Sequence, residues 1–395
     1  MVNLYPHWDI PSIIFYCIIA INCAMCISLA KSKEKKTGIK QKIISFPYVL
    51  CILILTLVAT CRHISPGIGG SDAPAYKLFF ETCLSDHTSI YYLHFDVLYR
   101  WFNIVVRLFT SNYYVYSIIF YGIIATCIIY FTNEFLNPRN SKLPLILIFY
   151  LYLRGFNTYR SNLAIAILLL SFVLYKKNKK ILAYLLAFST FFIHKASILY
   201  AFSLIFLDMF KNKKVKIKYC IILILITFIV GRIFQPYLMS IFSGDETNAY
   251  TYYMSVSIKE SFFANYWKIC FEQFIVLFLM ILFKKSINYK INEERNYLHE
   301  RNVIWQLCIF DFITIPVTYI LGIWRGYEYL YLPRLVMLGI IIGIINERCN
   351  RNSKFIVNAI VFILIISWMI FRIYNTWEDS YLLPYVFEPF LNWVN

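Results

Sequence analysis

Residues 143–218 read LPLILIFYLYLRGFNTYRSNLAIAILLLSFVLYKKNKKILAYLLAFSTFFIHKASILYAFSLIFLDMFKNKKVKIK. Two apolar blocks, residues 144–175 and 181–210, are flanked there by clusters of lysine. Lysine and arginine in short loops mark the cytoplasmic side of a membrane, so each block should leave the cytoplasm and return to it as a hairpin. Each arm has about 15 residues, whereas a comfortable span needs ~20. The two turns should therefore lie near the outer surface, and they carry three basic side chains: Arg154, Arg160 and His194.

The composition indicates a membrane protein. Hydrophobic residues make up 60% of the 395 residues and charged residues only 15%. A soluble protein of this length has no place for so many apolar runs of near membrane-spanning length. The net charge of +17 comes mostly from short loops predicted to be cytoplasmic, which is the positive-inside pattern. We therefore expect the lipid bilayer, with its anionic headgroups, to be the partner of these charges, and we expect no nucleic acid.

The chain is predicted to be an all-α, polytopic integral membrane bundle that forms a single membrane domain over residues 1–395. Its first apolar segment is an anchor helix and not a cleavable signal peptide, because Asp9 precedes it and a cluster of lysines follows it. Hydropathy predicts about twelve spans, including the two short hairpins, with both termini outside. The spans are 9–30, 43–61, 113–132, 143–156, 159–175, 181–194, 196–210, 217–239, 265–283, 302–323, 333–346 and 355–373.

Two long loops, residues 62–112 and 240–264, are predicted to lie outside. Within the first, residues 94–109 are mostly apolar, but polar residues recur every three or four positions. These polar residues are Asp96, Arg100, Asn103 and Arg107. This period is typical of an amphipathic helix in the outer interface. A thirteenth crossing there would place the lysine clusters outside, so we reject it.

The loop 62–112 begins with Arg62 and continues through Gly67-Ile-Gly69-Gly70-Ser71-Asp72 to Tyr76. Glycines let a backbone approach a ligand closely, and Asp72 with Tyr76 offers an acceptor beside an aromatic ring. The segment is not a dinucleotide-binding fingerprint, because no strand precedes it and the spacing differs. The structural alternative is a tight turn capped by Asp72 before a short helix.

The basic residues of the two hairpin turns have two interpretations. An arginine near membrane depth usually faces a cavity or a partner, and its planar fork binds phosphate through paired hydrogen bonds. Arg154 and Arg160 are either such anion ligands or side chains that extend to the lipid headgroups. His194 is either a core histidine or part of the same site, and its neighbour Lys195 favours the site.

A further basic cluster lies in the predicted outer loop 324–334, where Arg325 and Arg334 flank three tyrosines. Tyrosines at this position suit a membrane-interface belt as well as a platform for a ligand. Asp311 lies within the tenth predicted span. A carboxylate at that depth should pair with a buried cation.

Several motifs are missing from the sequence. It contains no Walker-type phosphate loop, no His-Glu-x-x-His, no Gly-x-Ser-x-Gly and no Asp-x-Asp metal motif. This argues against ATP-driven transport and against metal-dependent sugar transfer. We therefore expect no cofactor and no metal site.

The candidate residues, in this order, resemble the EpsG/Wzy-type polysaccharide polymerases of bacterial envelopes. The resemblance covers about residues 45–210 and follows the order Gly-x-Asp-x-x-x-Tyr, Arg-x-x-x-Ala, Phe-x-His-x-x-Ser. The matching residues are Arg62, Gly70, Ser71, Asp72, Tyr76, Asp96, Asn103, Arg160, Ala164, Ala166, Phe192, His194 and Ser197. Asp96 stands where the family usually has a glutamate. Beyond residue 220 only the topology and the loop from Arg325 to Arg334 agree.

The resemblance implies a multi-pass glycosyltransferase in the bacterial cytoplasmic membrane that acts at the outer face. It would pass a growing glycan from undecaprenyl pyrophosphate to the end of a fresh lipid-linked repeat unit, forming O-antigen, capsule or exopolysaccharide. Asp72 and His194 are then the candidate catalytic residues. The candidate substrate-binding residues are Arg62, Tyr76, Arg154, Arg160, Arg325 and Arg334. A chain-length regulator and a flippase are the partner proteins that the resemblance implies.

Two other functions stay open on the sequence alone. A flippase for the lipid-linked oligosaccharide predicts internal repeats and cations along a central path. This sequence shows no such repeat, and its outer cations cluster at the ends of the predicted spans. Another polyprenyl-linked sugar transferase, or a ligase, would share the same general architecture.

Overall fold

The computed structural model describes residues 9–66, 68–88, 95–210, 217–242, 267–287, 298–321, 323, 325–380 and 382–388. In these segments the regular structure is helical, which confirms the all-α class. Extended pairing there is confined to two isolated bridges, Arg62–Phe387 and Ser65–Ile68. The chain groups into two compact units, Met1–Ser197 with Ile345–Asn395 and Ile198–Ile344. That the whole chain acts as one membrane domain stays a prediction.

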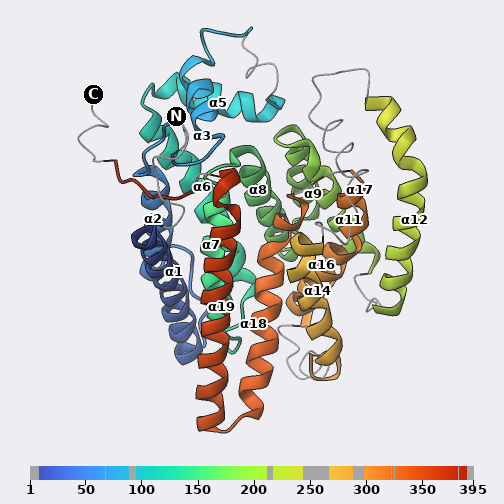
Figure 1. Cartoon of the computed structure of the whole chain (residues 1–395). Coiled ribbons are helices and arrows are strands. Elements are labelled where there is room, and N and C mark those ends of the chain that lie inside the picture. Colours follow the sequence, from blue (N-terminus) through green and yellow to red (C-terminus); the bar gives the residue numbers. More distant parts are fainter. Residues whose placement is uncertain are drawn as a thin grey trace. The chain divides into compact units, whose positions relative to one another are not determined.

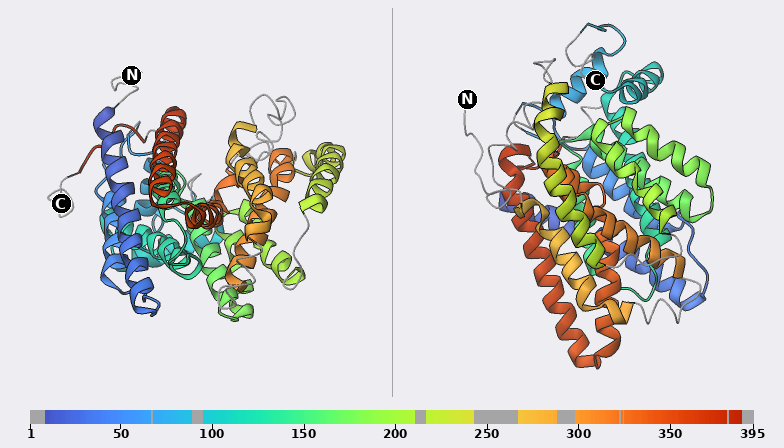
Figure 2. Two further views of the ribbon diagram at one scale, coloured as in Figure 1. Left: turned by 90° about the horizontal axis from the view of Figure 1, so that it is seen from below. Right: turned by 90° about the vertical axis from the view of Figure 1, so that its right-hand side faces the viewer.

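The first unit is a helical bundle (Figures 1 and 2). Its elements are α1 (Ile10–Thr37), α2 (Phe46–Thr60), α3 (Ala73–Thr82), α5 (Val97–Phe109), α6 (Tyr113–Phe135), η1 (Leu143–Leu147), α7 (Ile148–Arg154), α8 (Tyr159–Lys176), α9 (Lys180–Ser189), η2 (Thr190–Phe192), η3 (Lys195–Ser197) and α19 (Arg351–Ser380). α1, α2, α6, α8 and α9 pack in that order, each on the next. η1 and α7 pack against both α1 and α19.

Polar residues between the apolar runs set where the helices begin and end. α1 begins where the Asp9 carboxylate accepts the N–H of Ser12 at 3.2 Å. It ends at Gly38, whose φ of 68° lies in the left-handed region that favours glycine. α6 begins where the Asn112 side chain accepts the N–H of Tyr114 at 2.8 Å. The sequence therefore fixes the ends of these helices locally, before any tertiary packing.

Helices occupy every predicted span. Within the described segments, five helices are long and apolar enough to cross a membrane: Ile10–Thr37, Tyr113–Phe135, Tyr159–Lys176, Asn302–Ile320 and Arg351–Tyr374. Shorter apolar helices are Phe46–Thr60, Leu143–Arg154, Lys180–Phe192, Ile221–Ile233 and Cys270–Leu282. Helical segments also lie at the two other predicted spans, 196–210 and 333–346. The number of crossings and the outside position of both termini stay predictions, because the arms of the two hairpins are shorter than a typical span.

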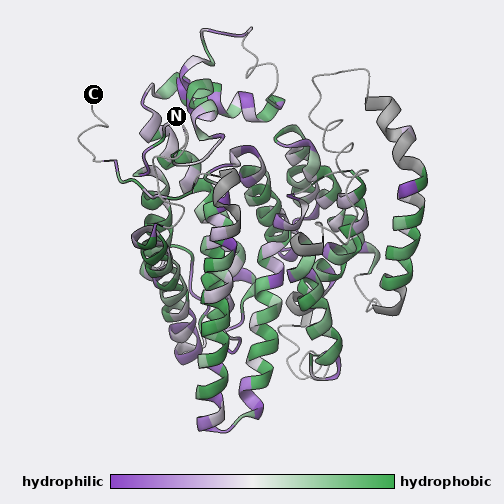
Figure 3. Ribbon diagram, in the orientation of Figure 1, coloured by the Kyte–Doolittle hydropathy of each residue, from purple (hydrophilic) through white to green (hydrophobic). Residues whose placement is uncertain are grey.

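The polar contacts of the first unit gather at two ends. One, called here the lysine end, comprises residues 31–42, 133–142, 176–177 and the start of α19. The other, called here the arginine end, comprises residues 61–72, 95–96, 157–160 and 382–388. α8 begins at the arginine end with Tyr159 and finishes at the lysine end with Lys176, so the two ends are separated by the length of this helix. In Figure 3 the middle of α1 and of α19 is hydrophobic, and their lower ends carry hydrophilic residues.

The predicted amphipathic helix is present as α5. Its apolar stripe is exposed and consists of Val97, Trp101, Val105 and Leu108. The opposite side is buried against the unit through Tyr99, Asn103 and Val106. Figure 1 shows α5 crosswise to the long axes of α1 and α19. This arrangement suits a helix that lies in the plane of a membrane interface.

The second unit is also helical. Its elements are α10 (Ile198–Ala201), α11 (Ser203–Met209), α12 (Ile217–Phe242), α14 (Trp267–Leu282), α16 (Leu298–Ile313), α17 (Ile315–Ile320), η6 (Gly326–Glu328) and α18 (Tyr331–Arg348). α16 packs against α11, α12 and α14 and so forms the centre of this unit. The predicted outer loop 240–264 lies outside the described residues from position 243 onward.

The two-hairpin topology makes a direct prediction for reporter fusions. Alkaline phosphatase folds only where its disulfides form, outside the cytoplasm. Fusions after Lys180 or Lys214 should therefore be inactive, and fusions near Asp72 or Tyr250 should be active. Phosphatase activity in colonies, normalised to the amount of fusion protein, measures this. Activity after Lys180 would rule out the two hairpins and would move His194 to the cytoplasmic side.

Candidate functional site

The glycine-rich loop of the arginine end docks on the turn between α7 and α8. Gly70 has a φ of 121°, and a Cβ there would lie 2.7 Å from the carbonyl oxygen of Phe156. The Asn157 side-chain oxygen accepts the N–H of Asp72 at 2.7 Å and the hydroxyl of Ser71 at 2.8 Å. The close approach that the glycines permit is therefore to this turn. It fixes Asp72 beside the start of α8.

Asp72 has an exposed carboxylate. It precedes α3, as predicted, but its side chain makes no capping hydrogen bond to that helix. The nearest polar contact of the carboxylate is the Ser71 hydroxyl at 3.4 Å. The expectation of a side-chain cap is therefore wrong, because the loop is held by Asn157 instead. A carboxylate left exposed in this way is free to accept a proton.

Arg62 is a buried cation at the centre of the arginine end, with 2% of its surface exposed. Its Nη2 donates to the hydroxyl of Tyr159 at 2.9 Å and to that of Tyr121 at 3.2 Å. Its guanidinium carbon lies 4.1 Å from the centroid of the Phe156 ring. Nε and Nη1 are buried and have no hydrogen-bond acceptor among the described residues. Because an arginine stays protonated, this position holds a positive charge that hydroxyls and rings stabilise.

Tyr76 connects the first outer loop to α8. Its ring stacks on Tyr159 with centroids 4.5 Å apart and an interplanar angle of 7°. On Phe95 it stacks at 5.2 Å and 18°. Because the ring stacks on Tyr159 and on Phe95, Tyr76 offers no flat surface to a sugar, and its hydroxyl interacts with the Arg160 side chain. Its role in substrate binding stays a prediction. The stack holds α3 and the segment before α5 against the first turn of α8.

Arg160 is the partly accessible arginine of this cluster. Its Nη1 donates to Asp96 Oδ2 at 3.0 Å, and its guanidinium carbon lies 4.9 Å from the centroid of the Phe95 ring. The side chain of Arg160 is 20% exposed and that of Asp96 is 9% exposed. Asp96 thus orients the guanidinium. The remaining exposed edge of Arg160 can meet an anion.

Arg154 and His194 lie at the two hairpin turns, as predicted. Arg154 is the last residue of α7, is half-buried, and its carbonyl oxygen accepts the Thr158 hydroxyl at 3.0 Å. His194 is half-buried between η2 and η3, and its N–H donates to the carbonyl oxygen of Thr190 at 2.9 Å. η2 packs against α5 and α8, the elements that Asp96 and Arg160 begin. The second turn therefore adjoins the same group of elements.

The two other predicted arginines belong to the second unit. Arg325 is half-buried at the start of η6. Arg334 is 2% exposed, and its Nη1 lies 3.2 Å from Oδ2 of Asp311, which is 1% exposed. Gln273 donates to the other carboxylate oxygen of Asp311 at 2.9 Å. The prediction that Asp311 pairs with a buried cation is confirmed. Its partner Arg334 has a structural ion pair here, and the role of both arginines in substrate binding stays a prediction.

The C-terminal segment is a part of the arginine end that sequence reasoning missed. Phe387 forms an antiparallel bridge with Arg62, and the carboxylate of Glu388 lies 3.3 Å from Nδ1 of His63. A cavity of about 780 Å³ lies beside this bridge. It is lined by Asp9, Pro11, Ser12, Phe15, Leu57, Val58, Cys61, Pro384, Tyr385 and Phe387. The hairpin-turn residues do not line it, so this cavity is not the cationic cavity that the sequence predicts.

The arginine end therefore has two layers. Asp72 is exposed, and Arg154, Arg160 and His194 at the neighbouring turns are partly exposed. Beneath them Arg62, Tyr76, Asp96, Asn157 and Tyr159 hold the first outer loop, α5 and α8 together. Three of these supporting contacts join segments that are far apart in the sequence: Asp72 to Asn157, Tyr76 to Tyr159 and Asp96 to Arg160. The arrangement can present positive charge and a proton acceptor on one surface.

The sequence was compared with models of known protein families, with curated proteins and with solved structures. The model of the EpsG family matches residues 45–387 of the chain. The match covers the arginine end and the whole of the second unit, so it extends well beyond the segment that carries the motifs. No curated protein and no solved structure matches the chain.

Proposed function

The chain belongs to the EpsG family, and we propose on this basis that it polymerises lipid-linked oligosaccharide repeat units at the outer face of the bacterial cytoplasmic membrane. Family membership and the apolar helices support a membrane protein of the polysaccharide-polymerase type. The proposed donor is a glycan on undecaprenyl pyrophosphate, and the acceptor is the terminal sugar of a second lipid-linked unit. The product is O-antigen, capsule or exopolysaccharide.

The observation that carries this proposal is the docking of the loop 62–72 on the start of α8. It brings Asp72 to Asn157, three residues before Arg160, and Asp96 from another predicted outer segment orients the arginine. These are the residues on which the resemblance rests. A proton acceptor and a cation on one surface are what sugar transfer from a pyrophosphate requires.

The proposed reaction is a single displacement. A hydroxyl oxygen of the acceptor sugar attacks the anomeric carbon of the donor glycan. The bond from that carbon to the pyrophosphate oxygen breaks, and its electron pair leaves with undecaprenyl pyrophosphate. The hydroxyl proton passes to a base, for which Asp72 and His194 are the candidates. One displacement inverts the anomeric carbon and needs no covalent intermediate with the enzyme, by analogy with inverting glycosidases.

The arginines would act on the leaving group. Negative charge grows on the pyrophosphate oxygen as the glycosidic bond breaks, and preorganised donors at that place lower the barrier. Arg160, which Asp96 orients and whose side chain is 20% exposed, would place positive charge beside this oxygen. Arg154 lies at the other side of the same short turn. Arg62, held beneath them, adds positive potential.

Reconstitution tests the proposed function directly. Purified protein in liposomes, given lipid-linked repeat units alone, is expected to extend them into a ladder on a gel. Extension should persist in the presence of a chelator, because the sequence shows no metal-binding motif and arginines supply the positive charge. Failure to extend any unit under conditions where the protein stays folded would remove the proposal. Complete inhibition by the chelator would overturn the mechanism that relies on arginine alone and would leave the function standing.

The same assay separates the two candidate bases. Loss of the general base should lower the extension rate by roughly 10²–10⁴-fold. We expect this of Asp72→Asn, because the carboxylate is exposed and the change keeps its shape. Glu81→Gln removes an exposed carboxylate from the same short helix and should have little effect. If His194→Gln shows the large loss and Asp72→Asn does not, the base is the histidine.

A further inference from the structure

The lysine end of the first unit carries more positive charge than its carboxylates balance. Its lysines are Lys31, Lys33, Lys35, Lys36, Lys40, Lys42, Lys142, Lys176, Lys177 and Lys354. Two carboxylates, Glu34 and Glu134, form ion pairs with lysines of this group. The lysines come from several elements that the bundle brings together, namely α1, the turn before η1, the end of α8 and the start of α19.

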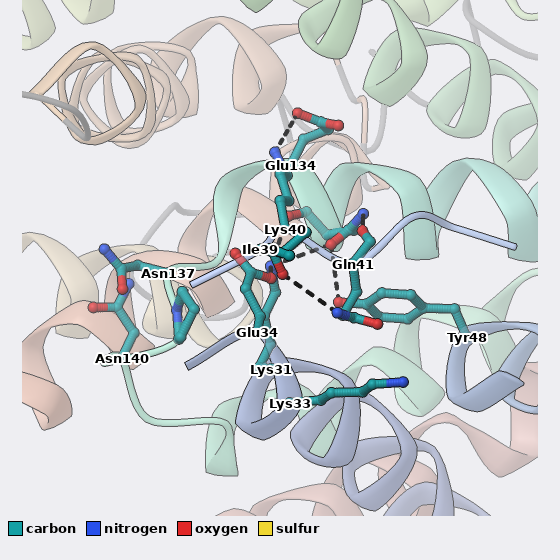
Figure 4. A network of polar contacts seen from close by, with 12 residues as sticks. Lys31, Lys33, Glu34, Ile39, Lys40, Gln41, Tyr48, Glu134, Asn137 and Asn140 are labelled. Atoms are coloured by element: carbon teal, nitrogen blue, oxygen red, sulfur yellow. Dashed lines mark hydrogen bonds and ion pairs between the residues drawn. The ribbon is translucent and has the colours of Figure 1, made fainter. Parts of the chain in front are cut away.

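Part of this charge is accounted for within the protein. Glu134 lies 2.7 Å from the ammonium of Lys40 and 3.2 Å from those of Lys176 and Lys177. The ammonium of Lys31 donates to Glu34 at 2.9 Å and also to the Asn133 carbonyl oxygen at 2.9 Å. Figure 4 shows Lys31, Glu34, Lys40 and Glu134 among the side chains of this network. Each of these four lysines therefore has a carboxylate partner.

Lys142 is different. Its ammonium donates to two backbone carbonyl oxygens of its own turn, those of Pro138 and Asn140. Within the described residues it has no ion pair with a carboxylate, although the ammonium groups of Lys35 and Lys354 lie close enough to oppose its charge. α1, η1 and α19 pack together at this point. Lys35, Lys142 and Lys354 thus come from elements that pack together, and Glu34, the carboxylate that acts on Lys142, is already paired with Lys31.

A buried amide on the same turn also lacks a partner. Asn140 is 3% exposed, and its Nδ2 has no hydrogen-bond acceptor within the described part of the chain. A buried donor without an acceptor costs free energy on the order of 1–3 kcal/mol. The turn 138–142 therefore holds an ammonium with carbonyl acceptors but no ion pair among the described residues, and an amide donor with no acceptor there.

We propose that Lys142, Lys35, Lys354 and the Asn140 amide form a site for a phosphate group, as carried by an anionic lipid headgroup. Basic pockets between membrane helices are known to hold such headgroups. A phosphate supplies several acceptor oxygens, enough for one amide and three ammonium groups at once. The site rests on the geometry of the lysine end and is independent of the proposed function, because it lies at the other end of α8 from the arginine end.

The acid–base behaviour of the site supports the proposal. Burial and the neighbouring ammonium of Lys31 and Lys35 lower the pKa of Lys142 to about 8, against the opposing charge of Glu34, and Lys354 adds to the lowering. A bound anion stabilises the protonated form. Affinity should therefore be complete below about pH 8 and should weaken as the pH rises through that value, where the empty site loses its proton.

Native mass spectrometry of the full-length protein tests the site. Purified protein is mixed with dioleoylphosphatidylglycerol or with dioleoylphosphatidylcholine, and the fraction that retains lipid is measured. The anionic lipid should be retained in preference, and Lys142→Gln and Lys354→Gln should each lower its retention about fivefold. Lys33→Gln is the matched control. Like the two test variants, it removes one positive charge from the lysine end. Its side chain on α1 is exposed and points away from Lys31 and Glu34 in Figure 4.

A second variant distinguishes loss of the site from misfolding of the protein. Asn140→Asp places a carboxylate beside Lys142, so it should raise the melting temperature of lipid-free protein while lowering retention of the anionic lipid. A misfolded variant would lower both.

Inorganic phosphate added to lipid-free protein identifies the source of the anion. A rise in melting temperature that Lys142→Gln and Lys354→Gln abolish, without a lipid preference, would support a soluble phosphate as the ligand. Lipid preference that these variants abolish supports the headgroup. If the protein responds to neither probe, or if the variants respond as the wild type does, the site does not exist.

Discussion

Arg160→Ala is expected to lower the rate of polymer extension by roughly 10²–10³-fold, the usual cost of removing one donor to a developing negative charge. Arg160 is placed for this role by its hydrogen bond to Asp96 at 3.0 Å and by the ring of Phe95. Its partly exposed side chain sits in protein-bounded surroundings, where a charge acts more strongly than in water. The rate of extension of lipid-linked units by purified protein measures the effect.

Arg160→Lys is expected to recover little of that loss. A lysine keeps the charge but not the planar fork, so it cannot make paired hydrogen bonds to a phosphate while also pairing with Asp96. Full activity in Arg160→Lys would mean that a point charge is enough, or that the arginine only extends toward lipid headgroups. Expression and membrane insertion should persist in both variants, because this side chain is not part of the packed core.

Two further variants separate a substrate role from a structural one. Asp96→Asn keeps the shape of the pair and should leave Arg160 able to act, with a smaller loss. If Arg160 served only to neutralise the nearly buried Asp96, Asp96→Asn combined with Arg160→Ala would restore activity. We expect no restoration. Arg107→Ala removes a cation from α5 instead of α8, and its rate of polymer extension should be close to that of the wild type.

The positions of the helices follow from local sequence signals. Apolar runs bounded by lysine clusters predicted helix at every span, and cap residues such as Asp9 and Asn112 mark where helices begin. α5 was predicted from a polar repeat of three to four residues, and its exposed apolar stripe agrees. The number of crossings does not follow in the same way, since a hairpin arm of about 15 residues is near the limit of a span.

The sequence motifs predict which residues belong to the site, but not which residues they contact. Glycine spacing indicated a close backbone approach near residue 70, but not that its partner is the turn at Phe156. Asp311 was expected to pair with a cation, but the sequence does not indicate that this cation is Arg334, which lies 23 residues further along the chain. Nothing in the sequence near Arg62 indicates Tyr159 or Phe387 as neighbours. Such contacts join distant segments and are decided by the packing of whole helices, which leaves no local pattern.

Two predicted substrate-binding residues, Arg62 and Tyr76, are buried, and their contact with the substrate stays a prediction. Arg62 and Tyr76 were expected to touch the substrate, because arginines and aromatic rings commonly bind phosphates and sugars. The structure places both in the buried layer, where Arg62 holds Tyr159 and Tyr76 stacks between Tyr159 and Phe95. A buried residue can match a functional motif because it positions a neighbour. Exposure, which sequence does not give, separates the two cases.

Deletion of this protein is expected to abolish long surface polymer and to leave the single repeat unit in place. Synthesis and export of the repeat unit do not need a polymerase. The lipid or surface molecule that normally carries the polymer should therefore still receive one repeat unit. A flippase would instead be needed for that unit to reach the surface, and an initiating glycosyltransferase would be needed for the unit to form. Complementation with the wild-type chain should restore the polymer, and complementation with Arg160→Ala should not.

The central claim is tested most directly by resolving the surface glycan of the deletion strain on a gel. The account predicts a single band of one repeat unit and no ladder. A ladder of normal length in that strain would contradict the polymerase function outright.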